Sequence, residues 1–576
     1  MKLSIKSIKN SKNHYLLFLI MFVVIYIFYS QIFPYRLWRM EEDNFFVLTS
    51  DFTKSVLTSP AGVAEWIGLW LVQWYKNVIV GILIHSTLLV LLGIISFFTF
   101  KENKLCGGLL GVAALPVAAT IGASFYGHSP VMIVSQIVLW AALLLFYKIK
   151  NSTLRIILFA FLLPILFFLL PGGVLLLLYI IIAISELKSK NRSLMSWSYA
   201  ILTLIAVSLP LLWNLLFFEP LAIRYSMFTN ATVPNWLTIL LFLPAIFTLF
   251  SLSKVKQIPF YWSYIGSTLL LIITCTILDQ NKVFKNAEES YHLEYLAENR
   301  MWNRIVKRGM GDEQSLYDLR MKYSVLSLIE LNKLPELLFS LPITPMFEYS
   351  YQSPNSRMTY GFNSRFYKSL NLTNEAMRFF FQDACMSDYG MNFRVIRNLA
   401  QCAKISGNDV LARKYLSILS KSNQDTKELE TFINDKREES PHLPQLFRSS
   451  TDINTIKRVI SSNYSTTSIN DCLLCYLLIQ KDLKTFAQVA SFCLTTPELV
   501  RGCYKEAALL CKINNIPCNL DISEEALRAY DDLMKMMNIG DSEGIERKFA
   551  GSYLRYFFSE IEVNKLYDYY MKKASK

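Results

Sequence analysis

Nine apolar runs, all before residue 280, constrain the fold more than any other feature of this sequence. A helix advances about 1.5 Å per residue, so about twenty apolar residues cross the hydrocarbon core of a bilayer. The stretch 155–185 is divided by Pro171, Gly172 and Gly173, which predicts a re-entrant pair or a tight hairpin. We predict spans at residues 15–33, 77–99, 105–125, 130–147, 156–170, 173–185, 194–216, 236–253 and 260–279.

Charge is divided unevenly along the chain. Up to Asp279 there are nine acidic and nineteen basic side chains, and beyond it thirty-six acidic and thirty-nine basic. The second half therefore has the composition of an ordinary soluble domain, whereas the net charge of +13 comes mainly from the first half. We predict an all-α chain with a polytopic membrane domain over residues 1–280 and a soluble helical domain over 281–576.

The basic side chains of the short loops predict the orientation. With nine spans, fourteen Lys and Arg residues fall on one side of the membrane and five on the other. The first span follows four lysines but has no small-residue cleavage site after it, so we expect it to remain as an anchor. We predict an inner-membrane protein with a cytoplasmic N-terminus and a periplasmic C-terminal domain. The surplus of Lys and Arg lies in the short loops between predicted spans, where it sets membrane orientation. The expected partner is therefore the bilayer and not nucleic acid.

The first outer loop, residues 34–76, is the most informative part of the membrane half. Glu41, Glu42 and Asp43 follow one another close to the predicted end of the first span. Trp66, Trp70 and Trp74 recur every four residues and so share one helical face. The run 59–62, Ser-Pro-Ala-Gly, is predicted to divide the rest of the loop into two helices that lie in the membrane interface.

Two interpretations of this loop remain open. The acids are either solvated groups of an interfacial loop, or a site in which a carboxylate binds a divalent cation or acts as a general base. In the second case Arg36 and Arg39 are candidates for holding the phosphates of a lipid-linked sugar. His128, in a short outer loop, and Arg224, in the last large outer loop, are candidates for the same cavity.

His85 is predicted to lie within the second span. An ionisable group inside a membrane is a candidate functional residue. The alternative is a hydrogen bond between neighbouring helices. Because buried charge is scarce in the predicted spans, a carrier or flippase is disfavoured.

The layout of the first 280 residues resembles the GT-C class of membrane glycosyltransferases. The resemblance consists of a first span followed by an outer loop that opens with Glu41, Glu42 and Asp43 and contains two interfacial helices. It implies that one of these acids is the catalytic base, that Arg36, Arg39 or Arg224 contacts phosphate, and that the donor is a sugar linked to polyprenyl phosphate. The cofactor stays open, with a divalent cation as one possibility, and no metal-binding motif is assigned.

A second resemblance covers most of the chain. Residues 42–46, the stretch from Pro60 through Trp66 to Tyr75, and residues 400–419 resemble an uncharacterised family of multi-spanning proteins from Bacteroidota with helical-repeat tails. That family implies no activity.

The soluble half shows helical periodicity broken by short polar turns. Helix pairs are predicted at 393–405 with 410–419, at 472–480 with 483–493, and at 323–331 with 335–339. Such pairs are typical of tetratricopeptide-like (TPR-like) hairpins, whose arrays offer a concave face to protein partners. Residues 421–448 are predicted to be a loop. Residues 347–360, rich in Tyr, Asn and Gln, are predicted to be a loop suited either to stacking on sugars or to packing on protein.

Eight of the ten cysteines follow residue 380, and they are predicted to be buried thiols rather than a disulfide framework. Cys472 and Cys475 form a single CxxC in a helical pattern, with no second such pair to complete a zinc site. We therefore expect both to pack inward from one helix face.

The sequence leaves two candidate functions. The first is a membrane-anchored helical-repeat scaffold of the cell envelope that binds protein partners. The second is a GT-C-like glycosyltransferase that uses a polyprenyl-phosphate-linked sugar at the periplasmic face.

Overall fold

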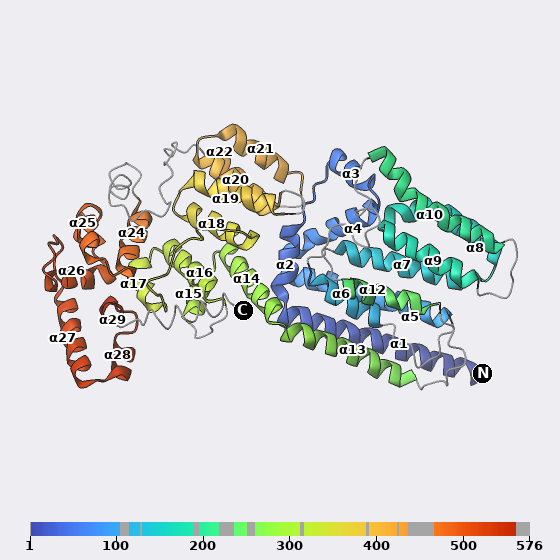
Figure 1. The fold of residues 1–576 in the computed structure, drawn as a ribbon, viewed down its shortest axis with the longest axis horizontal. Coiled ribbons are helices and arrows are strands. Elements are labelled where there is room, and N and C mark those ends of the chain that lie inside the picture. Colours follow the sequence, from blue (N-terminus) through green and yellow to red (C-terminus); the bar gives the residue numbers. More distant parts are fainter. Residues whose placement is uncertain are drawn as a thin grey trace. The chain divides into compact units, whose positions relative to one another are not determined.

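The computed structural model describes residues 2–103, 114–126, 130–187, 195–217, 235–249, 260–310, 316–387, 391–422, 425–435 and 466–559 (Figure 1). Every regular element within these ranges is a helix, which confirms the predicted all-α class. The chain divides into two compact units. The first comprises residues 1–291 with two later segments, 387–396 and 416–428, and the second comprises 292–386, 397–415 and 429–576.

The helices before residue 281 all belong to the first unit. They are α1 (Lys2–Ile27), η1 (Phe28–Ile32), α2 (Pro34–Asp43), α3 (Ser50–Leu57), α4 (Gly62–Val72), η2 (Gln73–Lys76), α5 (Val78–Glu102), α6 (Leu115–Ser124), α7 (Pro130–Lys148), α8 (Ser152–Leu169), α9 (Gly172–Leu187), α10 (Met195–Phe217), α12 (Asn235–Phe247) and α13 (Phe260–Gln280).

Four of these helices are long and apolar enough to cross a membrane: Tyr15–Ile32, Val78–Glu102, Pro130–Lys148 and Ser152–Leu169. Each of the other five predicted spans contains a shorter apolar segment of 10–17 residues, in α6, α9, α10, α12 and α13. The structure therefore supports membrane association, and the count of nine crossings stays a prediction.

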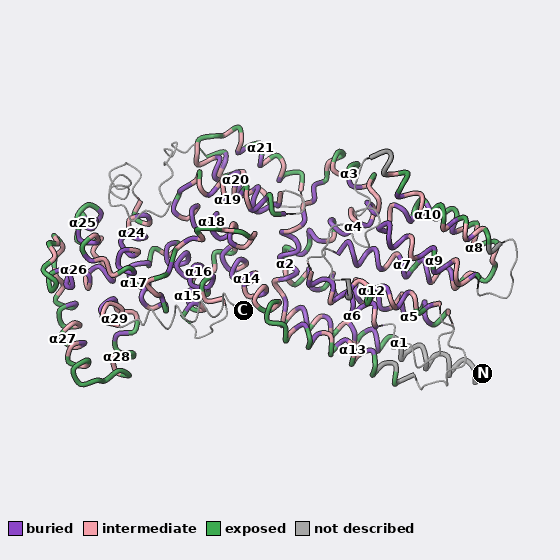
Figure 2. Tube along the Cα trace, in the orientation of Figure 1, coloured by how far each residue is buried: buried purple, intermediate pink, exposed green. Residues whose placement is uncertain are grey.

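Helices α8 and α13 each have an exposed face (Figure 2), and apolar residues lie along it. On α8, Leu154, Ile157 and Phe161 are 54%, 61% and 71% exposed, at the three- and four-residue spacing of one helical face. Ile265, Leu269 and further apolar residues repeat this pattern on α13. Exposed apolar residues grouped in this way fit contact with a bilayer.

The interior of the first unit is built from close helix pairs. Helix α5 packs against α7, and α1 packs against both α5 and α13 (Figure 1). His85 of α5 is buried, and its Nδ1 atom lies 3.0 Å from the Tyr75 hydroxyl. His85 therefore has the structural hydrogen bond that the sequence offered as the alternative to a functional role.

The outer loop folds as three short α-helices, α2, α3 and α4, followed by the 3-10 helix η2. The predicted break at residues 59–62 is confirmed, since α3 ends at Leu57 and α4 begins at Gly62. A Cβ atom at Gly62 would lie 1.9 Å from the Val56 carbonyl oxygen, so only glycine fits this turn. The preceding amide, of Ala61, donates to the Phe167 carbonyl at 3.0 Å and ties the turn to α8. The structure adds α2, a helix over the acidic run that the sequence analysis did not predict.

The later helices begin with α14 (Lys282–Glu298), within which the boundary between the units falls. The others are α15 (Trp302–Gly309), α16 (Tyr317–Glu330), α17 (Leu334–Leu337), η4 (Leu338–Ser340), α18 (Arg357–Ser369), α19 (Thr373–Cys385), α20 (Phe393–Ile405), α21 (Asp409–Leu419), α22 (Lys427–Asn434), α24 (Thr467–Ile479), α25 (Leu483–Cys493), η5 (Pro497–Leu499), α26 (Cys503–Ile513), α27 (Glu524–Ile539), α28 (Ser542–Lys548) and α29 (Tyr553–Phe558).

The same cap ends seven of the described helices of this half. A left-handed residue follows each helix, at Arg300, Asn332, Asn371, Gly407, Lys481, Asn515 and Gly540. The next amide then donates to the carbonyl four residues before the left-handed one, with N···O distances of 2.8–3.1 Å, as in a Schellman motif. This cap satisfies the last carbonyls of the helix and turns the chain toward the next helix.

Several helix pairs match the prediction closely. Helix α20 has the predicted bounds Phe393–Ile405 and α25 the predicted bounds Leu483–Cys493. The prediction of an uninterrupted loop over 421–448 is wrong, since α22 occupies Lys427–Asn434. Leu429 and Ile433, four residues apart, bury one face of this short helix. Residues 436–448 lie outside the described part of the chain.

Most described cysteines of the second half are buried free thiols, as expected. Cys472 and Cys475 are 1% and 0% exposed, and the Cys475 sulfur contacts the Tyr504 hydroxyl at 3.6 Å. This confirms the inward-packed interpretation of the CxxC. The expectation is wrong for Cys385, which is exposed, and Cys518 is half-buried.

Candidate functional site: an acid–arginine cluster

Helix α2 carries the predicted acids and is held at its N-terminus by a second carboxylate. Pro34 occupies the first turn, where its missing N–H costs no hydrogen bond. The Tyr35 amide donates to Glu288 Oε1 of α14 at 2.7 Å. This oxygen satisfies an N–H group at the start of α2 that has no partner within the helix. Burial raises the pKa of Glu288 to about 8, although the bond from Tyr35 and the nearby Arg36 act in the opposite direction.

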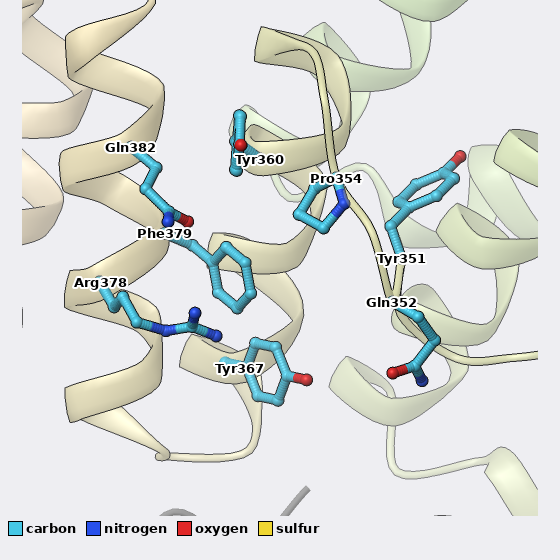
Figure 3. A pocket seen from close by; sticks show the side chains of 8 residues that line it. All are labelled: Tyr351, Gln352, Pro354, Tyr360, Tyr367, Arg378, Phe379 and Gln382. Atoms are coloured by element: carbon cyan, nitrogen blue, oxygen red, sulfur yellow. The ribbon is translucent and has the colours of Figure 1, made fainter. Parts of the chain in front are cut away.

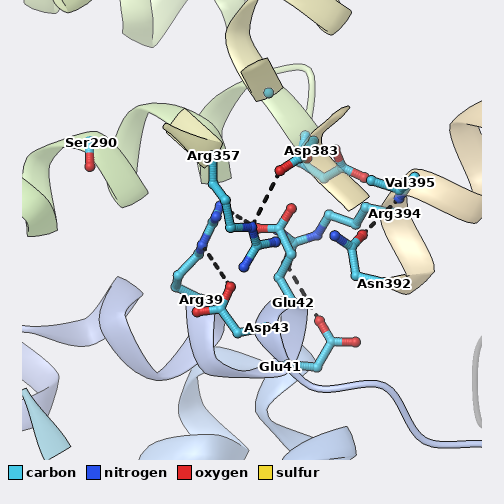
Figure 4. Close-up of polar contacts among 12 residues, drawn as sticks. Arg39, Glu41, Glu42, Asp43, Ser290, Arg357, Asp383, Asn392, Arg394 and Val395 are labelled. Atoms are coloured by element: carbon cyan, nitrogen blue, oxygen red, sulfur yellow. Dashed lines mark hydrogen bonds and ion pairs between the residues drawn. The ribbon is translucent and has the colours of Figure 1, made fainter. Parts of the chain in front are cut away.

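The three acids of α2 belong to a cluster with Arg39 and Arg394, which we call the acid–arginine cluster (Figure 4). Arg39 Nη1 lies 2.7 Å from Glu42 Oε2, and Arg39 Nε lies 3.3 Å from Asp43 Oδ1. These contacts join residues three and four apart on one helix, the spacing at which helical side chains meet. Glu41 and Glu42 are only 3% and 4% exposed.

Arg394 completes the cluster from the segment 387–396, which belongs to the same unit. Its Nη1 pairs with Glu42 Oε2, and its Nη2 lies 3.5 Å from Glu41 Oε2. The guanidinium stacks over the Trp38 ring with its carbon 3.5 Å from the ring centroid. A planar guanidinium suits both roles, since it forks to carboxylates and stacks on aromatic faces. Glu42 therefore bridges two arginines in a buried setting.

Both later segments of the first unit contact the outer loop. From segment 387–396, Phe393 lies against Phe45 with ring centroids 5.1 Å apart, and in segment 416–428 the Lys421 carbonyl accepts from the Leu48 amide at 2.9 Å. Asn392 Oδ1 accepts from the Val395 amide at 2.8 Å and so caps the start of α20. The ring contact of Phe393 and the hydrogen bond between Asn392 and Val395 thereby fix the backbone before and after Arg394.

Arg36, the other predicted phosphate contact, faces a different partner. Its guanidinium donates to the Ser124 and Phe125 carbonyls at the end of α6 and lies 4.3 Å from the centroid of the Phe125 ring. A cation at a helix C-terminus satisfies carbonyls that have no partner within the helix and interacts favourably with its dipole. Arg36 and Arg39 therefore point to separate partners.

Buried, paired carboxylates differ from a base that is open to substrate. Of the three acids, Asp43 is the most accessible, with a side chain 37% exposed. Taking one partner away from a buried pair leaves an uncompensated charge, which makes the pair important for folding. A base must also reach the proton that it removes, which the geometry favours for Asp43 more than for Glu41 or Glu42.

The other two predicted site residues, His128 and Arg224, lie outside the described residues. Within the described ranges, no group of three or more His, Cys, Asp or Glu side chains could hold a metal ion. In Figure 4, Arg357 and Asp383 belong to the second unit and pair with each other at 3.3 Å.

Sequence reasoning missed Arg394 and Glu288. No spacing rule connects Arg394 with Glu41 or Glu42, since 353 and 352 residues separate them. The only local indication for Glu288 is an acid soon after the last predicted span. An ion pair between Arg155 and Glu186, at the ends of α8 and α9, was also missed.

Comparison with known proteins gives one match. No curated protein and no solved structure matches the sequence. The model of a family of unknown function (DUF6057) matches residues 9–560, nearly the whole chain, so the match spans both units. The chain therefore belongs to this family of unknown function, DUF6057.

Proposed function

We propose that the protein is a membrane-anchored scaffold whose second unit is a TPR-like helical array that binds protein partners. One observation carries this proposal: the recurrence of the Schellman cap. Caps at Arg300, Asn332, Asn371 and Gly407 are 32, 39 and 36 residues apart, Lys481 and Asn515 are 34 apart, and Gly540 follows after 25. The interval from Gly407 to Lys481 includes residues outside the described part of the chain, and all the other intervals except the last lie near the length of a two-helix repeat.

Helical repeats of this length bury each hairpin against the next and leave an extended face for a partner. The acid–arginine cluster supports a non-catalytic role for the membrane unit, because Glu41 and Glu42 are buried and paired. In this proposal nine spans place the N-terminus in the cytoplasm and the helical array in the periplasm.

Site-specific cross-linking in whole cells tests the scaffold. A photoreactive phenylalanine at Val410 or Phe492, which are 83% and 54% exposed on α21 and α25, should capture the same protein from either position. The matched control is Phe161 of α8, 71% exposed on the proposed lipid face, which should capture none. Absence of any partner common to Val410 and Phe492 would dismiss the scaffold. A reporter fused after Lys576 tests the orientation, and activity confined to the cytosol would overturn the periplasmic placement.

A glycosyltransferase is the second candidate, favoured by the partial exposure of Asp43 next to the first span. In this alternative Asp43 activates an acceptor hydroxyl and a polyprenyl-phosphate-linked sugar is the donor. Asp43→Asn should then abolish glycan transfer while the protein level stays normal. Unchanged glycosylation in that variant would leave the scaffold as the better account.

A further inference from the structure

The second unit contains a pocket of about 270 Å³ within the α18–α19 hairpin and the segment that precedes it (Figure 3). Tyr360 and Tyr367 come from α18, and Arg378, Phe379 and Gln382 come from α19. Tyr351, Gln352 and Pro354 complete the lining from the preceding segment. The volume lies just under the range of about 300–1,000 Å³ typical of drug-sized ligand sites, which suits a ligand of one or two rings.

The wall of the pocket is a rigid set of aromatic rings. Tyr367 and Phe379 stack with centroids 5.3 Å apart and an interplanar angle of 4°, and Tyr360 lies 6.4 Å from Phe379. The Tyr367 hydroxyl is 3.3 Å from the Ser350 hydroxyl. Because Tyr367 and Phe379 are 6% and 4% exposed, the wall is held by the core and would need little ordering when a ligand binds.

The segment that carries Tyr351 and Gln352 is fixed by hydrogen bonds to α18. Asn363 of α18 bonds both sides of the Tyr351 backbone: its Oδ1 accepts from the Tyr351 amide at 2.9 Å and its Nδ2 donates to the Tyr351 carbonyl at 2.8 Å. Asn363 is fully buried. The loop that carries Tyr351 and Gln352 is therefore anchored, although it has no regular structure of its own.

The polar groups indicate a neutral ligand. Arg378 lies over the Phe379 ring at 4.2 Å, and its Nε and Nη2 atoms are 2.9 and 2.7 Å from Glu375 Oε2. Glu375 thus neutralises the guanidinium, which disfavours a phosphate or another strong anion. Gln382 Oε1 is buried and has no hydrogen-bond partner among the described residues. A buried acceptor without a donor is costly, so the Gln382 amide would be stabilised by turning toward a ligand hydroxyl or amide in the pocket.

We propose that this pocket binds a pyranose sugar. A pyranose combines an apolar C–H face, which packs on aromatic rings, with hydroxyl groups that can donate to Gln382 Oε1 and accept from the exposed Gln352 amide. This function is separate from partner binding by the helical array and does not depend on it.

Saturation-transfer NMR on the full-length protein tests the proposal. The protein should be purified in an amine-oxide detergent, because maltoside detergents would themselves offer sugar. The probes are the methyl glycosides of glucose, galactose, mannose and N-acetylglucosamine. At least one should bind saturably, and Gln382→Leu and Tyr360→Ala should each weaken its affinity at least tenfold. Gln488→Leu, on the exposed face of α25, is the matched control and should bind like the wild type.

A second arm tests whether the pocket contacts the sugar ring alone. The same sugar on a short polyprenyl phosphate should bind as tightly as the methyl glycoside and be equally sensitive to Gln382→Leu, since the pocket contacts only the ring. Absence of saturable binding by all four glycosides would overturn the proposal. So would binding unchanged in well-folded Gln382→Leu and Tyr360→Ala proteins, or displacement of the sugar by inorganic phosphate.

Discussion

The acid–arginine cluster of the first unit and the pocket of the second use polar side chains in opposite ways. In the cluster, Glu41 and Glu42 are paired with Arg394, and Glu42 also with Arg39. In the pocket, Gln382 presents a buried acceptor with no partner among the described residues, and Arg378 is neutralised by Glu375 beside it. Paired charge of the first kind is costly to break, whereas an unused acceptor beside rigid rings is typical of a binding site.

The largest effect should come from Arg394→Ala. This change leaves Glu41 and Glu42 buried without one of their cations, and breaking a buried pair costs about 3–5 kcal/mol. The free energy of unfolding in mixed micelles, followed by circular dichroism, measures it. Arg528→Ala, which removes an exposed pair with Glu524, is the control and should change stability little. A loss in Arg394→Ala no greater than in the control would contradict a structural role for the cluster.

Replacing both Glu42 and Arg394 by apolar residues tests whether the two side chains act as a pair. Buried ion pairs can often be exchanged for hydrophobic residues without loss, so Glu42→Leu with Arg394→Met should be less destabilised than the two single variants added together. We expect a coupling energy of about 1–3 kcal/mol from the double-mutant cycle. Strict additivity would show that Glu42 and Arg394 do not act as a pair.

Glu288 of the first unit resembles Gln382 of the pocket more than the paired acids of the cluster. Its Oε2 atom is buried without a hydrogen-bond partner among the described residues. Its pKa is raised to about 8 by burial, so the folded protein binds a proton that the unfolded chain releases above its ordinary pKa of 4.5. Stability should therefore fall as pH rises from about 4.5 to about 8, by at most about 1.4 kcal/mol per pH unit.

Glu288→Gln should remove this slope, because the amide oxygen can still accept from Tyr35 but does not ionise. Unfolding measured at pH 5, 6.5 and 8 in both proteins gives the comparison. Parallel pH profiles would show that Glu288 is ionised in the folded state and that its carboxylate resembles those of the cluster.

The smallest effect on stability should come from Asp43→Asn. Asp43 is 37% exposed and pairs with Arg39 four residues before it, a contact worth about 0–1 kcal/mol. Thermal unfolding checks the stability, and the envelope glycan profile of the same cells distinguishes the two proposed functions. A loss of several kcal/mol would place Asp43 with Glu41 and Glu42 in the structural core of the cluster.

Local patterns in the sequence predicted the helices well where turn residues and apolar period agreed. Gly407 and Lys481 mark turns that were expected from short polar runs, and α20 and α25 have the predicted bounds. Helix α22 was missed because its charged sequence resembles a loop and only two side chains bury its inner face. For α22, three-dimensional packing rather than local propensity decides the outcome.

The candidate site could be predicted only in part. Glu41, Glu42 and Asp43 were chosen for their position after the first span, and the structure places them on one helix. Their pairing with Arg394 could not be predicted, because a contact across more than 350 residues leaves no periodic trace in a single sequence. The pocket was anticipated only as a sugar-stacking alternative for residues 347–360, since α18 and α19 supply its other wall.

The distance along the chain between Glu42 and Arg394 also has a consequence for biogenesis. A ribosome adds about 5–20 residues per second, so the 352 residues between them take roughly 20–70 s to synthesise. During that interval the carboxylates of α2 must wait in water, in the translocon or against a chaperone. The first unit can reach its final packing only after much of the second unit has been made, so we expect a truncated product that ends before Arg394 to be degraded.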